Sequence, residues 1–131
     1  FLVGAGNLGA ALMGYAGFAR QGLAIVAAFD ADPARVGRKI GGKPVLPMTK
    51  LPDLARRMGV RLGILTVPEA AAPGAAAALV AAGIRGIWNF TPVRLDVGPE
   101  VIVEDVDLAQ SLAVLSHQLA AARRPRRQTA S

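Results

Sequence analysis

The sequence predicts an α/β fold: a doubly wound, mostly parallel sheet with helices on both faces. A glycine-rich turn, Gly-Ala-Gly-Asn-Leu-Gly at residues 4–9, follows an apolar run and opens onto a helical pattern. A second apolar run ends at an acid, Asp30, and strand-like and helix-like segments then alternate along the chain. Strands that alternate with helices form parallel sheets, because each connection must cross back over the sheet.

The glycine-rich turn has the spacing of a phosphate-binding turn. Gly4 permits the tight bend, Gly6 lets a pyrophosphate approach the backbone, and Gly9 lets the helix pack close to the strand. The first N–H groups of the helix have no partner within it, and the helix dipole favours a negative ligand. Similar turns also occur in ordinary loops, so the motif needs a second feature.

Asp30 supplies that second feature. It ends the predicted second strand, residues 25–29, about 20 residues beyond the turn, where dinucleotide-binding folds place an acid on the ribose hydroxyls. The same charge repels a 2′-phosphate, which favours NAD(H) over NADP(H). The alternative is that Asp30 only caps the end of the strand.

The first half of the chain is punctuated by glycine and proline. Leu8, Leu12 and Tyr15 share a face at helical spacing, which predicts a helix from residue 7 or 8 to residue 15 or 19 and ordinary packing for the tyrosine. After the second strand, Asp32 caps and Gly37 ends a short predicted helix. The next elements are a strand and a helix, expected at 45–46 and from residue 49 or 53 to residue 58.

The second half alternates in the same way. Residues 62–67 are apolar on both faces, as expected for a central parallel strand covered by helices. An alanine-rich helix is predicted at 69–82, followed by strands at 84–90 and 101–104. The last helix, from residue 106 or 107 to residue 122, carries leucines three to four residues apart, which predicts a face packed on the core or on another subunit.

Ligands bind such sheets at the carboxyl ends of the strands, near the point where the strand order reverses. The turn at 4–9 and Asp30 fall there and would hold the adenosine diphosphate half of a dinucleotide. The segments 66–68 and 89–92 also fall there, and they would flank the nicotinamide half.

Composition excludes several classes of function. Four of the six net positive charges come from arginines in residues 123–131, so the remaining +2 does not support a basic nucleic-acid-binding surface. The absence of cysteine excludes disulfides, thiol catalysis and cysteine metal sites. No apolar run reaches the ~18 residues that span a bilayer, and no secretory signal is visible, so we expect a cytoplasmic protein without a membrane partner.

The chain lacks the groups that a dehydrogenase needs. Hydride transfer requires a side chain that exchanges a proton with the substrate. His117 is the sole histidine and lies late in the last predicted helix. There is no Ser-x-x-x-Tyr-x-x-x-Lys pattern, nucleophile elbow or histidine–acid metal cluster. We therefore expect no catalytic residues, no metal and a sensor or regulatory module.

Six blocks of the sequence resemble the family of redox-sensing transcriptional repressors called Rex. They are Gly-Ala-Gly-Asn-Leu-Gly at 4–9, Gly-Tyr-Ala-Gly-Phe at 14–18, Phe-Asp-Ala-Asp-Pro at 29–33, Leu-Thr-Val-Pro at 65–68, Gly-Ile-Trp-Asn-Phe-Thr-Pro at 86–92 and Val-Glu-Asp-Val-Asp-Leu at 103–108. The resemblance extends from residue 1 to about residue 119, and the order and spacing of the blocks make it specific.

The resemblance implies a Rossmann domain that binds NADH and NAD⁺ and forms a homodimer by exchanging its last helix. It also implies that operator DNA is bound by a winged-helix domain, absent from this chain, and released when NADH binds. It places Tyr15 near the nicotinamide and Asp107 at the hinge of the redox switch. The cofactor-binding residues are then expected to be Gly4, Ala5, Gly6, Asn7, Leu8, Gly9, Tyr15, Asp30, Asp32, Thr66, Val67, Pro68, Asn89, Phe90, Thr91 and Pro92.

We expect two parts: a Rossmann NAD(H)-binding and dimerisation domain at 1–122 and a disordered basic tail at 123–131. Because residue 1 already lies within a strand, we expect the chain to be a fragment of a longer protein. Two alternatives stay open. One is a small NAD-dependent dehydrogenase or CoA-binding enzyme domain, and the other is a dimerisation module with a vestigial nucleotide site.

Overall fold

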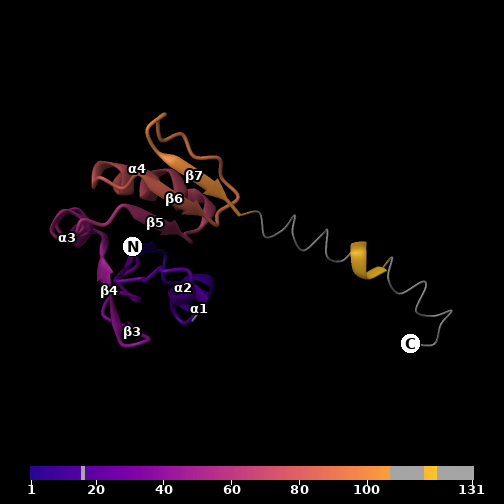
Figure 1. Ribbon diagram of the computed structural model, residues 1–131. Helices are drawn as coiled ribbons and strands as arrows, with labels where there is room; N and C mark the ends of the chain where they lie inside the picture. The colour runs from indigo at the N-terminus through magenta and orange to yellow at the C-terminus, as the bar shows by residue number, and fades with distance from the viewer. Residues whose placement is uncertain (16, 107–116, 121–131) are drawn as a thin grey trace.

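The computed structural model describes residues 1–15, 17–106 and 117–120. The strands are short, and helices lie between some of them but not between all (Figure 1). In chain order the elements are β1 (Leu2–Val3), α1 (Asn7–Met13), α2 (Gly17–Arg20), β2 (Ala28–Asp30), β3 (Lys39–Ile40), β4 (Lys43–Pro47), the 3₁₀ turn η1 (Met48–Lys50), α3 (Leu51–Met58), β5 (Leu62–Leu65), the 3₁₀ turn η2 (Glu69–Ala71), α4 (Ala72–Ala81), β6 (Gly86–Asn89) and β7 (Ile102–Asp105).

The seven strands of the described residues form one sheet in the order β3-β4-β2-β1-β5-β6-β7. Every neighbouring pair is parallel except β3 and β4, which form an antiparallel hairpin at one edge. Without β3, this order is that of the doubly wound dinucleotide-binding fold. The predicted fold class is therefore confirmed, and the strand order reverses between β1 and β5.

The strand register aligns the predicted site segments along one edge of the sheet. Val3 pairs with Phe29 on one side and with Leu65 on the other, so the turn after β1 lies between the ends of β2 and β5. Leu65 pairs in turn with Asn89, and Asn89 with Asp105. All of these positions are carboxyl ends, where parallel sheets bind ligands.

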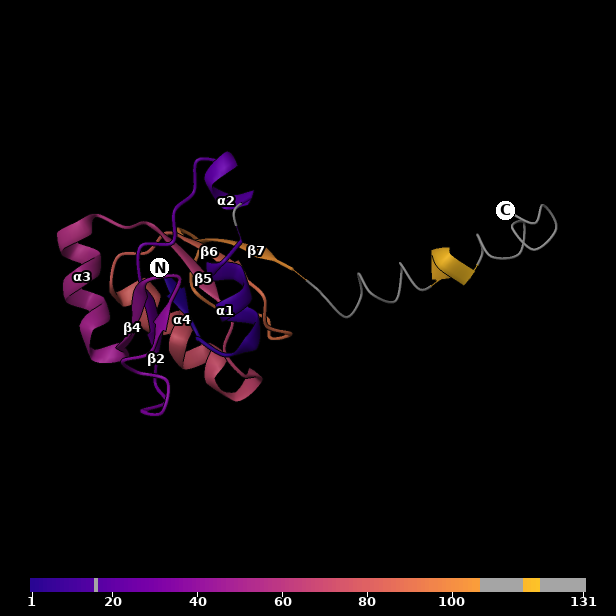
Figure 2. The ribbon, with the colours of Figure 1, turned by 90° about the horizontal axis from the view of Figure 1, so that it is seen from below.

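Side chains that alternate along the strands separate the core into two layers. Val3, Phe29 and Leu65 belong to the layer covered by α3 and α4, and their neighbours Leu2 and Ile64 belong to the layer covered by α1 and α2. In Figure 2, α3 and α1 flank the strands from opposite sides. The prediction of helices on both faces is thus confirmed.

The helix predicted at 32–37 is wrong, because this segment forms turns. The Asp30 side chain accepts a hydrogen bond from the Asp32 N–H, and the Asp32 side chain accepts one from the Ala34 N–H. Such local bonds offer the backbone an alternative to the helix. Gly37 then adopts a φ of 90°, and its N–H bonds to Val45, which turns the chain into the β3–β4 hairpin.

Three further boundaries differ from expectation. The first helix ends at Met13, and the separate helix α2 follows it, while the second strand is shorter than predicted and starts at Ala28. β6 is shorter than the strand predicted at 84–90. Between β6 and β7, Val93, Leu95 and Val97 pack against the core without regular secondary structure. Most of the predicted last helix, residues 107–116 and 121–122, lies outside the described residues, and 117–120 are helical.

Candidate adenine-nucleotide site

The glycine turn after β1 is shaped by contacts that exclude side chains. Gly4 has a φ of 103°, and a Cβ built there would lie 2.6 Å from the Thr66 carbonyl oxygen. A Cβ on Gly9 would lie 2.0 Å from the Gly4 oxygen, so α1 approaches the strand too closely for any other residue. The three atoms nearest to a Cβ on Gly6 all belong to the Arg35 guanidinium, at 3.7 Å. The backbone at Gly6 is therefore open toward a long, movable side chain.

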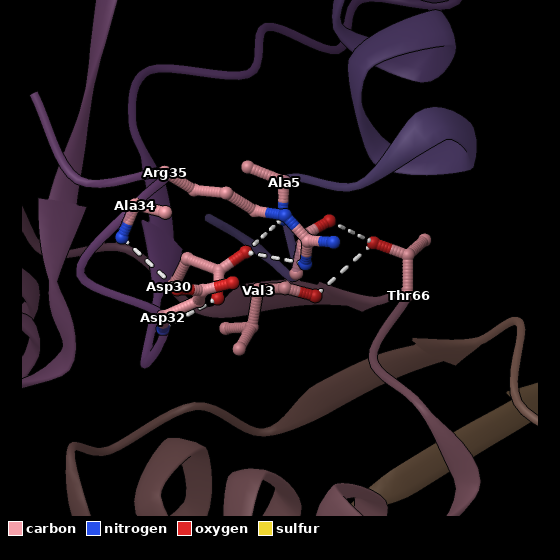
Figure 3. A network of polar contacts seen from close by, with 8 residues as sticks. Val3, Ala5, Asp30, Asp32, Ala34, Arg35 and Thr66 are labelled. Atoms are coloured by element: carbon pink, nitrogen blue, oxygen red, sulfur yellow. Dashed lines mark hydrogen bonds and ion pairs between the residues drawn. The ribbon is translucent and has the colours of Figure 1, made fainter. Parts of the chain in front are cut away.

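Asp30 lies directly beside this turn (Figure 3). Its Oδ2 accepts a hydrogen bond from the Ala5 N–H at 2.8 Å, and its Oδ1 accepts one from the Asp32 N–H at 2.9 Å. The guanidinium of Arg35 approaches Oδ2 to 3.3 Å. Asp30 is thus more than a strand cap, because it joins the first two strand ends into one site.

The environment of Asp30 keeps it ionised. Burial of this residue, which is 7% exposed, raises the pKa. The backbone hydrogen bonds from Asp32 and Ala5, together with the hydrogen bond and charge of Arg35, outweigh burial and leave the pKa of Asp30 below its ordinary value of 3.8. A carboxylate that is charged at neutral pH accepts hydrogen bonds and donates none. Asp32, which is exposed, sits in the adjoining turn.

Thr66 supports the glycine turn through its hydroxyl group. Its Oγ1 lies 2.6 Å from the Gly4 oxygen and 3.1 Å from the Val3 oxygen, and it donates its single proton to one of them. The hydroxyl also lies 2.9 Å from the position of a Cβ on Gly9. Thr66 was predicted to flank the nicotinamide, and here it holds the glycine turn in place. Val67 is half-buried after it, and Pro68 is exposed.

Asn89 is fully buried at the end of β6, and its amide is completely paired within the protein. Its Nδ2 donates to the Val93 oxygen at 2.9 Å and to Asp105 Oδ1 at 2.8 Å. Its Oδ1 accepts from the Thr91 N–H at 3.0 Å and from the Thr91 hydroxyl at 2.7 Å. An amide offers two donors and two acceptor positions, so none is left for a ligand. Asn89 therefore shapes the loop at 90–93 and anchors it to β7.

Aromatic rings connect Tyr15 to the end of β6. The Tyr15 ring is 59% exposed and packs edge-on against Phe18, with centroids 5.0 Å apart. Phe18 contacts Trp88 at 5.6 Å, and Trp88 contacts Phe90 at 4.9 Å. Tyr15 and Phe90, both predicted near the nicotinamide, thus belong to one aromatic row. Pro92 is exposed beyond it, and Asp107 lies outside the described residues.

A cavity of about 490 Å³ opens beside the glycine turn. Three cationic side chains line it, and none of them is among the predicted site residues. The lining residues are Ala5, Gly6, Asn7, Ala10, Arg35, Arg38, Lys39 and Ile40. A sequence signal existed: three cations follow Asp30 within nine residues. Positions 35, 38 and 39 would share one face even in a helix, so their spacing alone did not place them beside the glycine turn.

Within 1–15, 17–106 and 117–120, no three His, Asp or Glu side chains gather in a way that could hold a metal. His117 is exposed. The same ranges contain no helix that is both long and apolar enough to cross a membrane. What the site does offer is an anionic acceptor, an open backbone turn and a cationic cavity.

Several curated proteins with similar sequences are named redox-sensing transcriptional repressor Rex. A redox-sensing transcriptional repressor Rex from Carboxydothermus hydrogenoformans is 47% identical over 118 residues, which are 90% of this chain and 57% of the relative. The Rex of Treponema denticola is 45% identical over 115 residues, 88% of this chain and 55% of its own. The chain therefore spans a little over half the length of the curated relatives it matches.

Solved structures agree with the sequences. The crystal structure of RSP, a Rex-family repressor, superposes with a TM-score of 0.85 at 35% identity, covering 99% of this chain and 62% of that one. RSP in complex with β-NADH gives a TM-score of 0.84 at 36% identity over 97% of this chain and 61% of that one. A third RSP structure, with β-NAD⁺ and operator DNA, gives 0.83 at 35% identity over 99% and 60%.

A family model described as the CoA binding domain matches residues 1–93. This stretch runs from β1 past the end of β6 and contains the glycine turn, Asp30 and Asn89. The resemblance to the Rex repressors is confirmed by the relatives, and the chain belongs to the CoA binding domain family, whose model covers 93 of its 131 residues.

Proposed function

We propose that this chain is the NAD(H)-sensing domain of a redox-responsive transcriptional repressor. The relatives named Rex and the RSP complexes with β-NADH and β-NAD⁺ support this proposal. In the full-length protein, NADH binding would release a homodimer from operator DNA, which a winged-helix domain outside this chain would contact. The RSP complex with operator DNA supports that partner. The repressor would act in the cytoplasm.

The observation that carries the proposal is the position of Asp30 beside the glycine turn. A diphosphate needs backbone that it can approach. Gly6 offers it, since the atoms nearest to a Cβ built there belong to the Arg35 side chain and lie 3.7 Å away. The adjoining ribose needs an ionised acceptor, and Asp30 Oδ1 keeps one free lone pair after bonding Asp32. The negative charge of Asp30 disfavours a 2′-phosphate, so the site fits NAD(H) better than NADP(H).

Sensing requires that NADH and NAD⁺ stabilise different states by different amounts. The two ligands differ by a hydride and by the positive charge of the oxidised ring. Val67, Pro68, Phe90 and Pro92 would provide apolar surface for the neutral ring, and desolvating the charged ring costs more. A hundredfold preference for NADH requires only about 2.7 kcal/mol. Tyr15 would lie near the nicotinamide ring, and Asp107 would act at the hinge of the redox switch.

Residues 1–122 would serve both cofactor binding and dimerisation, with the last helix exchanged between subunits. Residues 123–131 would be a basic tail outside that domain. The relatives are named as repressors and not as enzymes, which supports a site that binds NADH without turning it over.

CoA is the second candidate ligand, because the matching family model is described as a CoA binding domain. CoA shares the adenosine diphosphate moiety with NADH but carries a phosphate on the ribose. Asp30 would repel that phosphate at close range, whereas Arg38 and Lys39 on the same cavity would attract it. The two ligands therefore make different demands on the same residues.

Calorimetric titration of the 131-residue chain with NADH, NAD⁺ and CoA tests the proposal. We expect NADH to bind more tightly than NAD⁺, CoA to give no signal, and the NADH absorbance to stay constant over hours. Asp30→Ala should abolish NADH binding. Equal affinity for NADH and NAD⁺ would contradict sensing, and CoA binding without NADH binding would favour the second candidate. Binding of no nucleotide at all would indicate a dimerisation module with a vestigial site.

A further inference from the structure

Arg35 occupies an unusual place in the nucleotide site. Its Nη1 lies 3.3 Å from Asp30 Oδ2, and its guanidinium carbon and both terminal nitrogens lie 3.7 Å from the position of a Cβ on Gly6 (Figure 3). One side chain therefore covers both the acceptor expected for a ribose and the turn expected for a diphosphate. Its side chain is 37% exposed, so it is free to turn toward solvent.

Counting acceptor positions shows that Asp30 cannot hold Arg35 and a whole ribose edge together. Each carboxylate oxygen offers about two lone pairs. Oδ2 accepts from the Ala5 N–H and from Arg35, and Oδ1 accepts from the Asp32 N–H. One position is left, on Oδ1, whereas the two ribose hydroxyls need two. For both hydroxyls to bind, Arg35 must leave Oδ2, because the backbone N–H groups of Ala5 and Asp32 are held by the fold.

The cavity beside the turn offers Arg35 a second partner. Arg35, Arg38 and Lys39 all line it, together with Gly6 and Asn7 of the turn, and none of the described residues that line it is acidic. A guanidinium matches the geometry of phosphate oxygens with two parallel hydrogen bonds. A diphosphate above Gly6 would thus lie within the reach of the group that the ribose displaces.

We propose that Arg35 exchanges partners when an adenine nucleotide binds. In the free protein it pairs with Asp30; in the complex the ribose takes Oδ2 and Arg35 pairs with the diphosphate. Arg35 would therefore select nucleotides over nucleosides. A ligand without phosphates must break the ion pair with Asp30 and offers Arg35 no new anionic partner. The inference rests on the proposed nucleotide site, and it concerns the adenosine diphosphate moiety that NADH and CoA share.

This exchange gives Arg35→Ala effects of opposite sign on two ligands. Adenosine should bind about two- to fivefold more tightly, because a partly exposed ion pair that competes with the ribose is gone. ADP and NADH should bind about tenfold more weakly, because a charged partner of the diphosphate is gone. A residue that only supports the turn would weaken all three ligands alike.

The test is an NMR titration of the 131-residue chain with adenosine, ADP and NADH at low salt, for the parent and three variants. Arg38→Ala removes the same charge from the same cavity without touching Asp30, so it should weaken ADP and leave adenosine unchanged. Arg56→Ala removes a charge from α3, where Arg56 pairs with the exposed Asp53, and should change neither affinity.

The outcomes separate the two proposals. Tighter adenosine and weaker ADP in Arg35→Ala alone would establish the exchange. If the parent binds NADH but Arg35→Ala leaves adenosine unchanged or weaker, the exchange is refuted and the nucleotide site stands. If the parent binds neither NADH nor ADP, both proposals are refuted.

Discussion

Two polar centres lie along the carboxyl edge of the sheet, and they differ in how many hydrogen-bonding positions they keep free for a ligand. At the ends of β1 and β2, Asp30 has a free acceptor position, a movable partner in Arg35 and a cavity beside it. At the ends of β6 and β7, Asn89 has both donors and both acceptors engaged by the protein itself. An equivalent position in a sheet therefore does not imply an equivalent role.

The comparison assigns recognition to the Asp30 centre and support to the Asn89 centre. A group that binds a ligand must exchange its partners at low cost, and an ion pair that is partly exposed does so. A buried amide with four hydrogen bonds is costly to disturb, because each lost partner leaves a buried polar group unpaired. Variants of the two centres should accordingly change different quantities.

The largest effect is expected from Asn89→Ala. Removal of the amide leaves Val93, Thr91 and Asp105 without their partner, which should lower the free energy of unfolding by about 2–4 kcal/mol. Urea denaturation measures it. Asn7→Ala is the matched control, because Asn7 is exposed, and it should change stability by less than about 0.5 kcal/mol. An Asn89→Ala variant as stable as the parent would contradict the supporting role of Asn89.

Asp30→Asn should weaken binding more than it weakens the fold. The amide is the same size but lacks the charge, so NADH affinity should fall about 30- to 100-fold, equivalent to about 2–3 kcal/mol. Unfolding in urea should show a loss of about 1–2 kcal/mol, because the single amide oxygen cannot replace both carboxylate oxygens, which accept from the Ala5 and Asp32 N–H groups. If the loss of stability exceeded the loss of binding energy, Asp30 would belong with the supporting centre.

Thr66→Val tests a residue between the two centres. The valine keeps the shape but cannot donate to the Gly4 oxygen, which should cost about 1 kcal/mol of stability. NADH affinity should fall only severalfold, because the turn loosens while Asp30 remains. Thr49→Val, at an exposed threonine, is the control for the substitution itself. An unchanged melting temperature in Thr66→Val would remove its supporting role.

The smallest effect is a pH dependence of stability. Because the folded state lowers the pKa of Asp30 below 3.8, ionised Asp30 stabilises the fold above that pH, and the contribution is lost as pH falls through the folded-state value. The difference in unfolding free energy between the parent and Asp30→Asn should be constant from pH 7 to about pH 5 and shrink below pH 3.8. A difference that grows on acidification would show that the pKa is raised.

Much of the fold followed from local rules. Apolar runs that end at turn residues located β1, β5, β6 and β7, and the glycine stops located the ends of α3 and α4. Proline at the start of α4 was compatible with the helix because its first N–H groups have no partner there. The same rules wrongly predicted a helix at 32–37, because the Asp30 and Asp32 side chains accept hydrogen bonds from the Asp32 and Ala34 N–H groups and hold the segment in turns.

The candidate site was predicted only in part. The spacing of Gly4, Gly9 and Asp30 was sufficient to place them together, because each meets a requirement of its own backbone or strand end. Neither Arg35 on Asp30 nor Asp105 on Asn89 was predictable in that way, because each contact joins segments whose meeting depends on turn geometry and strand pairing.

By itself, the sequence determined the elements that obey short-range physics: the glycine turn, the buried runs and the acid that ends the second strand. Only the tertiary structure decided which of the polar residues at the sheet edge keep capacity for a ligand. The physical reason is that hydrogen-bonding capacity is shared among neighbours in space. Asn89 uses all of its capacity in hydrogen bonds to Thr91, Val93 and Asp105. Asp30 uses part of its capacity in a bond to Arg35, whose side chain can turn away.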